Sequence, residues 1–318
     1  MNQKNTKPHL FGIENSNRNF DSSQAWGKNQ FNSAFPASLC CYLDSKGISA
    51  NFIKLENEQT TVGEIEIESA FGCSPKNKNI FFSFEDTFKP YEKYSVGQLP
   101  RVDLVIKNLE DGRDYSGIEI KLTALPDNST CQLSEEKYGS EIVVRPDTIV
   151  YLACSLARNL DSQLKQLLSN KIVISDWTDQ NEVIPFIPII LSLIKKICIK
   201  AEQNQKAFLL QPIWKTQGKS PNLSNNCLDI FFWSDSAFGM FISESGIVNQ
   251  DKINRHTRTS IWLYKMLLEI SEKGKFDHKK IIDTMTYDTK NDKAFASSGT
   301  VTHKYMNSKR LVKPIIEK

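Results

Sequence analysis

Sequence signals that mark several large classes of protein are missing from this chain of 318 residues. The seven cysteines include no Cys-x-x-Cys pair, and none of the four histidines stands at zinc-ligand spacing from a cysteine pair. Common structural zinc sites and a disulfide framework therefore have no support. The odd number and scattered positions of the cysteines predict free, reduced thiols, which fits a cytoplasmic protein.

Long apolar runs and phosphate-binding loops are also absent. The most apolar stretch, residues 183–199, is interrupted by Pro185, Pro188 and two lysines. It is too short to span a bilayer and is predicted to be a buried core segment. The first residues contain no apolar run that would serve as a signal peptide. No glycine-rich phosphate loop, Walker sequence or Gly-x-Ser-x-Gly elbow occurs, so a cofactor-dependent small-molecule enzyme has no positive support.

The net charge is small, but the charged residues are unevenly distributed along the chain. The net charge of +3 combines residues 252–318, with 15 Lys/Arg and 7 Asp/Glu, and residues 1–251, with 25 and 30. A basic region beside a mildly acidic one is typical of a nucleic-acid enzyme with an acidic catalytic site. A solvated surface is the alternative, and it is the commoner explanation of a charge run.

The order of predicted elements indicates the fold class. Strands are predicted at residues 80–84, 102–106, 115–122, 227–233 and 240–242, and helices at residues 26–43, 147–168, 183–201 and 258–272. The turn Asp111-Gly112 joins two of the strands into a hairpin. We therefore expect an α/β (α+β) fold in which a mixed central β-sheet is flanked by helices. A single domain over residues 1–318 would carry a polar N-terminal arm (about 1–25) and a basic C-terminal region (about 252–318).

The sharpest chemical pattern lies on the predicted hairpin. Asp103 stands on its first strand, and Glu119 and Lys121 share one face of its second strand. Two carboxylates on adjacent strands can converge on a divalent cation, and the backbone carbonyl of Ile120 offers a third hard oxygen. Lys121 is then placed to orient a water molecule for attack on a phosphate.

The tripeptide [Asp/Glu]-x-Lys is a weak signal when taken alone. It occurs five times, starting at Asp44, Glu119, Glu135, Asp277 and Asp288. Only the tripeptide at Glu119 lies on a strongly alternating strand that follows a partner strand carrying an aspartate. The competing interpretation is a hairpin with a solvent-exposed Glu/Lys face, which any sheet edge can show.

These residues carry a resemblance to a known family. Pro100-Arg-Val-Asp103 followed by Glu119-Ile-Lys121 resembles the PD-(D/E)xK nuclease signature. Longer stretches resemble type II restriction endonucleases of the HindVP family. These stretches are Ser16–Arg18, Trp26–Gln30, Leu99–Ile106, Glu119–Asp127, Gln211–Lys219 and Asp229–Asp235. The resemblance covers the chain from about residue 10 to about residue 270.

The resemblance implies a Mg²⁺-dependent endonuclease with a restriction-endonuclease-like core that cuts double-stranded DNA in a restriction system. Asp103 and Glu119 would be metal ligands together with the Ile120 carbonyl, and Lys121 would act on the attacking water. Family members are associated with the degenerate palindrome GRCGYC, where R is a purine and Y a pyrimidine. A cognate DNA methyltransferase is the expected genetic partner. Cutting both strands of a palindrome requires two active sites, so we expect a homodimer.

The first motif departs from the signature, because the sequence reads Pro-Arg-Val-Asp where the signature has Pro-Asp. Asp103 is therefore chosen by its position on the strand. Related folds recruit another acidic residue from upstream, and both Glu85 and Glu68 are candidates. The sequence does not choose between them.

Further DNA contacts are predicted outside the hairpin. Arg145 precedes the predicted helix at 147–168, where an ion pair with Glu141 or Asp147 is the alternative. A polar and basic stretch contains Lys215, Gln217 and Lys219, and Arg255 and Arg258 lie at the start of the predicted helix at 258–272. The alternatives for these positions are an ordinary surface loop and a solvated helix end.

Two other functions remain open on the sequence alone. A non-catalytic DNA-binding protein would make its contacts through the basic C-terminal region, with Glu119 and Lys121 merely paired on a sheet surface. A repair or mobile-element nuclease would share the same core. The agreement outside the hairpin, especially over residues 211–235, favours the restriction endonuclease.

Overall fold

The structure, a computed structural model, describes the chain in nine segments. They are residues 13–15, 37–120, 140–169, 172–204, 209–210, 213–214, 230–247, 250–287 and 301–305. Within them, residues 13–15, 140–143, 209–210, 213–214, 230–231 and 301–305 are described by their backbone alone.

Three sheets occur in the described part of the chain. The largest has the order β1-β4-β5-β6-β8, formed by Ile13–Asn15, Ile80–Asp86, Val102–Asn108, Asp114–Ile118 and Leu209–Leu210. β4, β5 and β6 are antiparallel neighbours, and the outer strands β1 and β8 run parallel to β4 and β6. The second sheet has the order β3-β2-β10-β9, formed by Gln59–Ile65, Ala50–Glu56, Ile230–Trp233 and Ile213–Trp214. Strands β7 (Ser140–Val144) and β11 (Val301–Tyr305) make the third.

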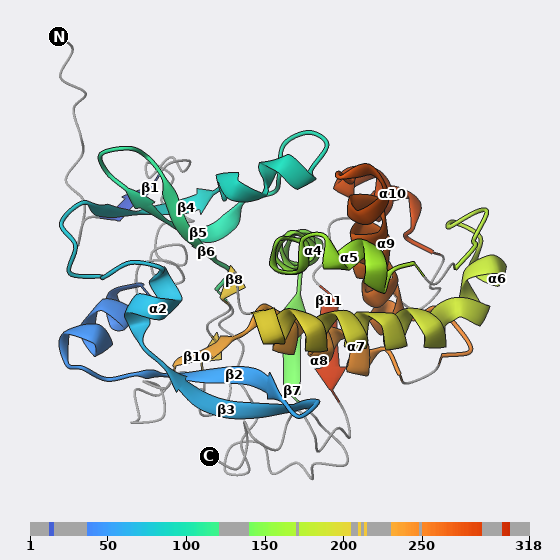
Figure 1. Ribbon diagram of the computed structural model, residues 1–318, viewed down its shortest axis with the longest axis horizontal. Helices are drawn as coiled ribbons and strands as arrows, with labels where there is room; N and C mark the ends of the chain where they lie inside the picture. Colours follow the sequence, from blue (N-terminus) through green and yellow to red (C-terminus); the bar gives the residue numbers. More distant parts are fainter. Residues whose placement is uncertain are drawn as a thin grey trace, which may run out of the picture.

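The long helices gather on one side of the molecule and the two larger sheets on the other (Figure 1). The long helices are α4 (Pro146–Leu160), α7 (Ile187–Asn204), α8 (Asp235–Ser245) and α9 (Arg255–Lys273). Shorter ones are α2 (Ile67–Phe71), η2 (Lys89–Tyr94), α5 (Gln163–Leu167), α6 (Gln180–Val183), η3 (Ile184–Phe186) and α10 (His278–Thr284), and residues 37–45 are also helical. None of the described helices is long and apolar enough to cross a membrane.

Two clusters of buried apolar side chains hold these layers together. The larger one joins α4, α7, α8 and α9, and twelve of the fifteen residues of α4 are buried in it or beside it. The smaller one packs between the two larger sheets and includes Phe52, Phe82, Ile106, Ile118 and Phe232. Burial of apolar side chains on both sides therefore fixes β5 and β6 in the middle of the molecule, with α4 against one end of them.

The predicted fold class is confirmed, because the chain forms mixed sheets flanked by helices. The β5–β6 hairpin and the helices α7 and α9 form where the sequence patterns predict them. Residues 240–242, predicted as a strand, lie instead in the middle of α8. That helix begins at Ser234, whose side chain accepts a hydrogen bond from the Ala237 N–H and so favours helical continuation.

The predicted helix at 147–168 is two helices. The chain breaks at Asp161, whose φ of 48° lies in the left-handed region. α4 also starts earlier than predicted, since Pro146 occupies its first turn and Arg145 takes the cap position. Proline suits this position because its missing N–H would have no partner inside the helix.

Candidate active site at the end of the β5–β6 hairpin

The register of β5 and β6 brings the two predicted metal ligands together. Leu104 pairs with Ile118 and Val105 with Gly117. Continuing this antiparallel register by one residue sets Asp103 opposite Glu119, so that both side chains belong to the same face. β6 ends at Ile118, one residue before Glu119, which differs from the predicted strand over 115–122.

Asp103 is fixed against the backbone that carries Glu119. The Ile120 N–H donates a hydrogen bond to Asp103 Oδ2 at 2.6 Å. Hydrogen bonds to an ionised carboxylate are the stronger kind, and this one closes the hairpin where the ladder has ended. It therefore holds the Asp103 carboxylate beside residues 119 and 120.

Glu119 is buried, with an exposed fraction of 5%. The Thr148 hydroxyl donates to Glu119 Oε1 at 3.4 Å, which ties the carboxylate to the first turn of α4. A buried carboxylate is costly unless its charge is compensated, and a cation is the usual compensation besides hydrogen bonds. Glu119 is thus held between the end of β6 and the start of α4.

Tyr151 fastens α4 to the segment that leads into β5. Its hydroxyl donates to the Pro100 carbonyl at 2.7 Å and accepts from the Phe88 N–H at 3.1 Å. Burial raises the pKa of Tyr151 above its ordinary value, so the hydroxyl stays protonated and keeps its donor role. Because Thr148 and Tyr151 are three residues apart on one helical face, α4 is anchored to both strands that carry the carboxylates.

Lys107 is a second lysine of this hairpin, and its surroundings differ from those of a reactive group. Its ammonium lies 2.5 Å from Asp86 Oδ2 and 3.5 Å from Asp114 Oδ1, and only 7% of the residue is exposed. Burial by itself would raise the pKa of Asp86, but hydrogen bonds from Lys107, Ser83 and the Thr87 N–H outweigh it and hold the pKa below its ordinary value. These contacts indicate that Lys107 holds the hairpin to β4.

The pKa of Asp114, in the same cluster, is shifted in the opposite direction. Burial is the largest influence on it and raises its pKa, although the Lys89 N–H, at 2.8 Å, and Lys107 act against the rise. One cation is thus shared by two carboxylates, of which Asp114 is buried and Asp86 is partly exposed. The arrangement is a structural ion cluster that links β4, β5 and β6.

The register also bears on the choice between the two upstream acids. Phe84 pairs with Leu104 and Asp86 with Val102, so Glu85 stands opposite Asp103 on the other side of β5. Its φ of 49° breaks the pleat of β4 at this point. Glu68 lies instead on the exposed side of α2. Within the described residues, no three or more His, Cys, Asp or Glu side chains are arranged to hold a metal ion.

Several predicted site residues lie outside the described residues. These are Lys121, immediately after the last described residue of the hairpin, and Lys215, Gln217 and Lys219. Arg145 is described, and it is exposed at the N-terminal end of α4. Arg255 is half-buried in the first turn of α9, whose positive end is capped by the Asn254 side chain.

The prediction of a phosphate contact by Arg258 conflicts with its position. Only 3% of this residue is exposed, and its Nη1 donates to the Thr286 carbonyl at 2.8 Å. The guanidinium also lies over the Trp262 ring, 5.2 Å from the ring centre. Arg258 therefore stabilises the packing of the chain after α10 against α9, and its guanidinium is not exposed for a phosphate contact.

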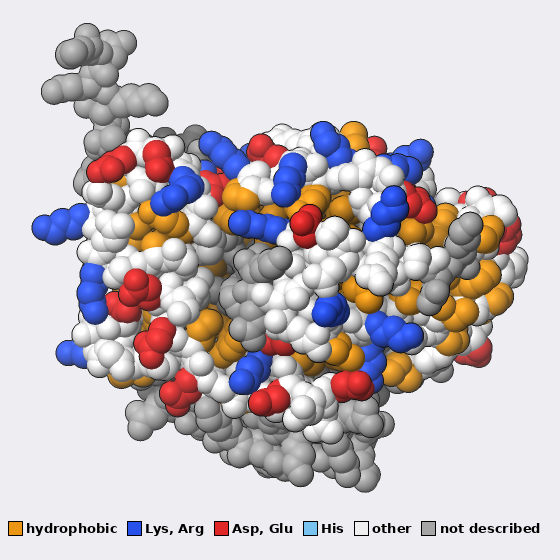
Figure 2. Space-filling model, in the orientation of Figure 1, with side chains coloured by type: hydrophobic (Ala, Val, Ile, Leu, Met, Phe, Trp, Pro, Cys, Tyr) orange, Lys and Arg blue, Asp and Glu red, His pale blue; other side chains and the backbone are white. Residues whose placement is uncertain are grey.

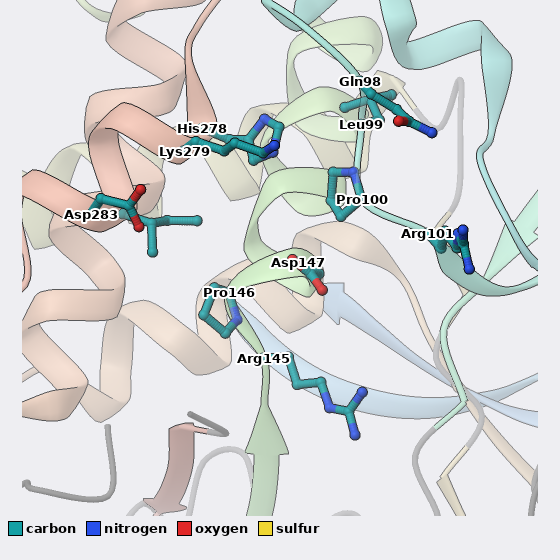
Figure 3. A pocket seen from close by; sticks show the side chains of 11 residues that line it. Gln98, Leu99, Pro100, Arg101, Arg145, Pro146, Asp147, His278, Lys279 and Asp283 are labelled. Carbon is teal, nitrogen blue, oxygen red and sulfur yellow. The ribbon is translucent and has the colours of Figure 1, made fainter. Parts of the chain in front are cut away.

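A pocket of about 650 Å³ lies beside the segment that leads into β5 (Figure 3). Its walls come from three parts of the chain: residues 98–101 before β5, residues 145–147 at the start of α4, and α10. Arg101 and Arg145 extend their guanidinium groups to the same side of it.

The other residues around the site could hardly be predicted from the sequence. Arg101 had one usable signal, because it stands two positions before Asp103 in an extended segment and so shares its face. Thr148, Tyr151 and Lys279 carry no such signal. Thr148 and Tyr151 reach the strands because α4 packs beside the hairpin, and Lys279 lines the pocket because α10 lies across it.

Comparison with known proteins identifies the family. The profile of the family described as HindVP restriction endonuclease matches residues 26–318. The chain belongs to this family. The probable type II restriction enzyme HindVP of Haemophilus influenzae is 49% identical over 318 residues, covering 99% of this chain and 86% of the relative. The type II restriction enzyme HgiDI of Herpetosiphon aurantiacus is 43% identical, covering 100% and 90%. No solved structure matches the chain.

Membership confirms the expected family and enzyme class, a site-specific type II restriction endonuclease acting on double-stranded DNA. Type II restriction enzymes generally use divalent metal ions, which agrees with the two carboxylates at the end of the hairpin. The match extends well beyond the hairpin, as the sequence resemblance predicted.

Proposed function

We propose that this restriction endonuclease hydrolyses phosphodiester bonds in double-stranded DNA with Mg²⁺, at a short palindrome for which GRCGYC is the first sequence to test. One observation carries the assignment to this site. The Asp103 carboxylate is bound to the Ile120 N–H, beside the buried carboxylate of Glu119. The arrangement joins two acids and one backbone segment at the end of a rigid hairpin.

The donor set fits Mg²⁺. Asp103, Glu119 and the Ile120 carbonyl are hard oxygen donors, and Mg²⁺ prefers such donors while keeping several of its waters. Two protein carboxylates are enough, so a third acidic ligand is not required. When bound, the ion would lower the pKa of a water and neutralise charge that develops on the phosphate.

The residues of the chain have separate tasks in this proposal. The Ile120 N–H and the Thr148 hydroxyl orient the Asp103 and Glu119 carboxylates before DNA arrives. Lys121 follows Glu119 by two positions, and we propose that its ammonium orients the attacking water. Tyr151 keeps α4 and the strands in one arrangement, so the carboxylates need not reorganise during the reaction.

The function is tested by incubating the purified protein with phage DNA and Mg²⁺. We expect discrete fragments that are not formed in the presence of EDTA, and sequencing of the fragment ends should place every cut at GRCGYC. Fragments that end at another palindrome would overturn the recognition sequence alone. Binding without cutting under any divalent ion would overturn the catalytic assignment.

We propose Glu85 over Glu68 as the acidic residue that supports the metal site from upstream, because its backbone stands opposite Asp103. We expect Glu85→Gln to raise the Mg²⁺ concentration needed for half-maximal cleavage by about tenfold, the size typical for loss of an outer partner of a metal site. Glu68→Gln is the matched control and should leave it unchanged.

A Mg²⁺ titration of the cleavage rate separates the two variants. Equal values for wild type and Glu85→Gln would remove Glu85 from the site. A rise in Glu68→Gln alone would assign the role to Glu68.

We also propose that the enzyme acts in the cytoplasm as a homodimer, with a cognate DNA methyltransferase as its genetic partner. A palindrome presents the same target on both strands, and a two-fold dimer matches that symmetry. Exposed apolar side chains support an interface, since Val173 and Ile189 are 73% and 48% exposed. Apolar side chains gather at the end of the molecule where α6 and α7 lie (Figure 2).

A further inference from the structure

The pocket between the start of α4, α10 and residues 98–101 collects cations from distant parts of the sequence. Arg101, Arg145 and Lys279 line it, and all three are exposed. Three cations from three separate segments meet here only because the chain folds, which separates this site from a local charge run. The same lining includes two carboxylates, Asp147 and Asp283.

The charges are not evenly placed within the pocket. Asp283 lies on the α10 side with Lys279, opposite the side to which Arg101 and Arg145 extend (Figure 3). The arginine side therefore holds two cations against the single carboxylate of Asp147. Asp147 stands in the first turn of α4, where the helix dipole favours a negative charge. This side of the pocket is left with positive charge exposed to solvent.

Two of the three walls of the pocket, residues 98–101 and 145–147, connect it to the carboxylates. Arg101 stands two residues before Asp103 along an extended segment, a separation of roughly 7 Å. Arg145 stands three residues before Thr148, which donates to Glu119. A DNA strand whose scissile phosphate lies at Asp103 and Glu119 must pass these neighbours, and its backbone offers a phosphate at every nucleotide.

We propose that Arg101 and Arg145 bind an internucleotide phosphate of the cleaved strand, adjacent to the scissile phosphate, in this pocket. The inference rests on the proposed function and adds a second phosphate site to it. Guanidinium groups suit this ligand because their planar donors match phosphate oxygens in pairs. Lys279 contributes charge from the wall formed by α10, which also carries Asp283.

Binding of a short GRCGYC duplex, measured in EDTA over a range of salt concentrations, tests the pocket without cleavage. We expect Arg101→Ala and Arg145→Ala each to weaken binding roughly tenfold. Each should also reduce the slope of log K against log salt by about one, the mark of one lost phosphate contact. Arg113→Ala is the matched control, because Arg113 is exposed at the opposite end of the same hairpin.

A second measurement locates the phosphate. Single phosphates of the duplex are replaced by uncharged methylphosphonates, and each duplex is bound to wild type, Arg101→Ala and Arg113→Ala. We expect one position next to the scissile bond at which the replacement weakens wild type and Arg113→Ala clearly more than Arg101→Ala, in which only Arg145 still contacts that phosphate. Elsewhere the losses should be the same in all three proteins, as for independent contacts.

The proposed phosphate contact would be overturned if Arg101→Ala and Arg145→Ala bound DNA as Arg113→Ala does. It would also be overturned if the effect of Arg101→Ala were the same whichever phosphate is replaced. Neither result would affect cleavage by wild type, so the proposed function would stand. A wild-type protein that cuts no DNA with any divalent ion would overturn the proposed function instead, while the binding slopes would still report on the pocket.

Discussion

Asp103→Asn should lose at least about a thousandfold in cleavage rate, since losing roughly 4 kcal/mol of transition-state stabilisation costs three factors of ten. The substitution removes one negative oxygen donor from the proposed metal site. The remaining amide oxygen can still accept the hydrogen bond that the Ile120 N–H donates to Asp103. The fold should therefore survive, and DNA binding in EDTA should be equal to that of wild type or tighter.

Single-turnover cleavage and duplex binding measured on the same preparation check this expectation. Asp111→Asn is the matched control, because Asp111 lies exposed in the turn of the same hairpin and accepts from the Arg113 N–H. It should cut at the wild-type rate. A cleavage rate within tenfold of wild type in Asp103→Asn would mean that Asp103 does not hold the metal.

Lys107→Met should reduce the free energy of unfolding by about 3–5 kcal/mol at pH 7, the usual cost of removing one partner from a buried ion pair. The substitution leaves Asp86 and Asp114 without the cation between them. Urea unfolding measures the loss. Lys54→Met is the control, because the exposed Lys54–Glu56 pair, at 3.9 Å, should contribute less than about 1 kcal/mol.

The loss of unfolding free energy in Lys107→Met should depend on pH. The pKa of Asp86 is lower in the folded protein than in the unfolded chain. Its contribution to stability is therefore complete above about pH 3.8, the ordinary pKa of the carboxyl group. The contribution is lost as the pH falls through the folded pKa. The deficit of Lys107→Met should therefore be largest near neutral pH and shrink below about pH 4. An unfolding free energy within 1 kcal/mol of wild type at pH 7 would contradict the structural role of Lys107.

The local geometry of the hairpin could be predicted from the sequence because it depends on neighbours along the chain. Alternation places Asp103 and Glu119 on facing strands, and the Asp111-Gly112 turn sets their distance along the chain. The end of β6 at Ile118 was not predicted, since the pattern continues while the ladder does not. The bond from the Ile120 N–H to Asp103 replaces the missing ladder contact.

Features that depend on packing between distant segments were beyond the sequence. Spacing could not rank Glu85 against Glu68, whereas the register of β4 with β5 sets Glu85 opposite Asp103. A cation count could not reveal that Arg258 is buried against Trp262. The pocket shared by Arg101 and Arg145 also requires α4 to be docked beside the hairpin.

The division of charge along the sequence corresponds only in part to charge in space. Lys and Arg side chains are interspersed with Asp and Glu on the face shown in Figure 2, with no large area of one sign. The proposed phosphate pocket draws Arg101 and Arg145 from the acidic part of the sequence and Lys279 from the basic part. Attraction of DNA is therefore expected to come from cations assembled by folding, beyond those of the C-terminal region.

The central claim is that Asp103 and Glu119 hold the metal ion that serves cleavage. Crystals of the protein bound to a GRCGYC duplex and soaked in Mn²⁺ test it most directly, because anomalous scattering locates the ion without reference to the protein. We expect a peak coordinated by one oxygen each from Asp103, Glu119 and the Ile120 carbonyl, beside a phosphate of the duplex. An ion that lies at the DNA but is held by other residues would contradict it.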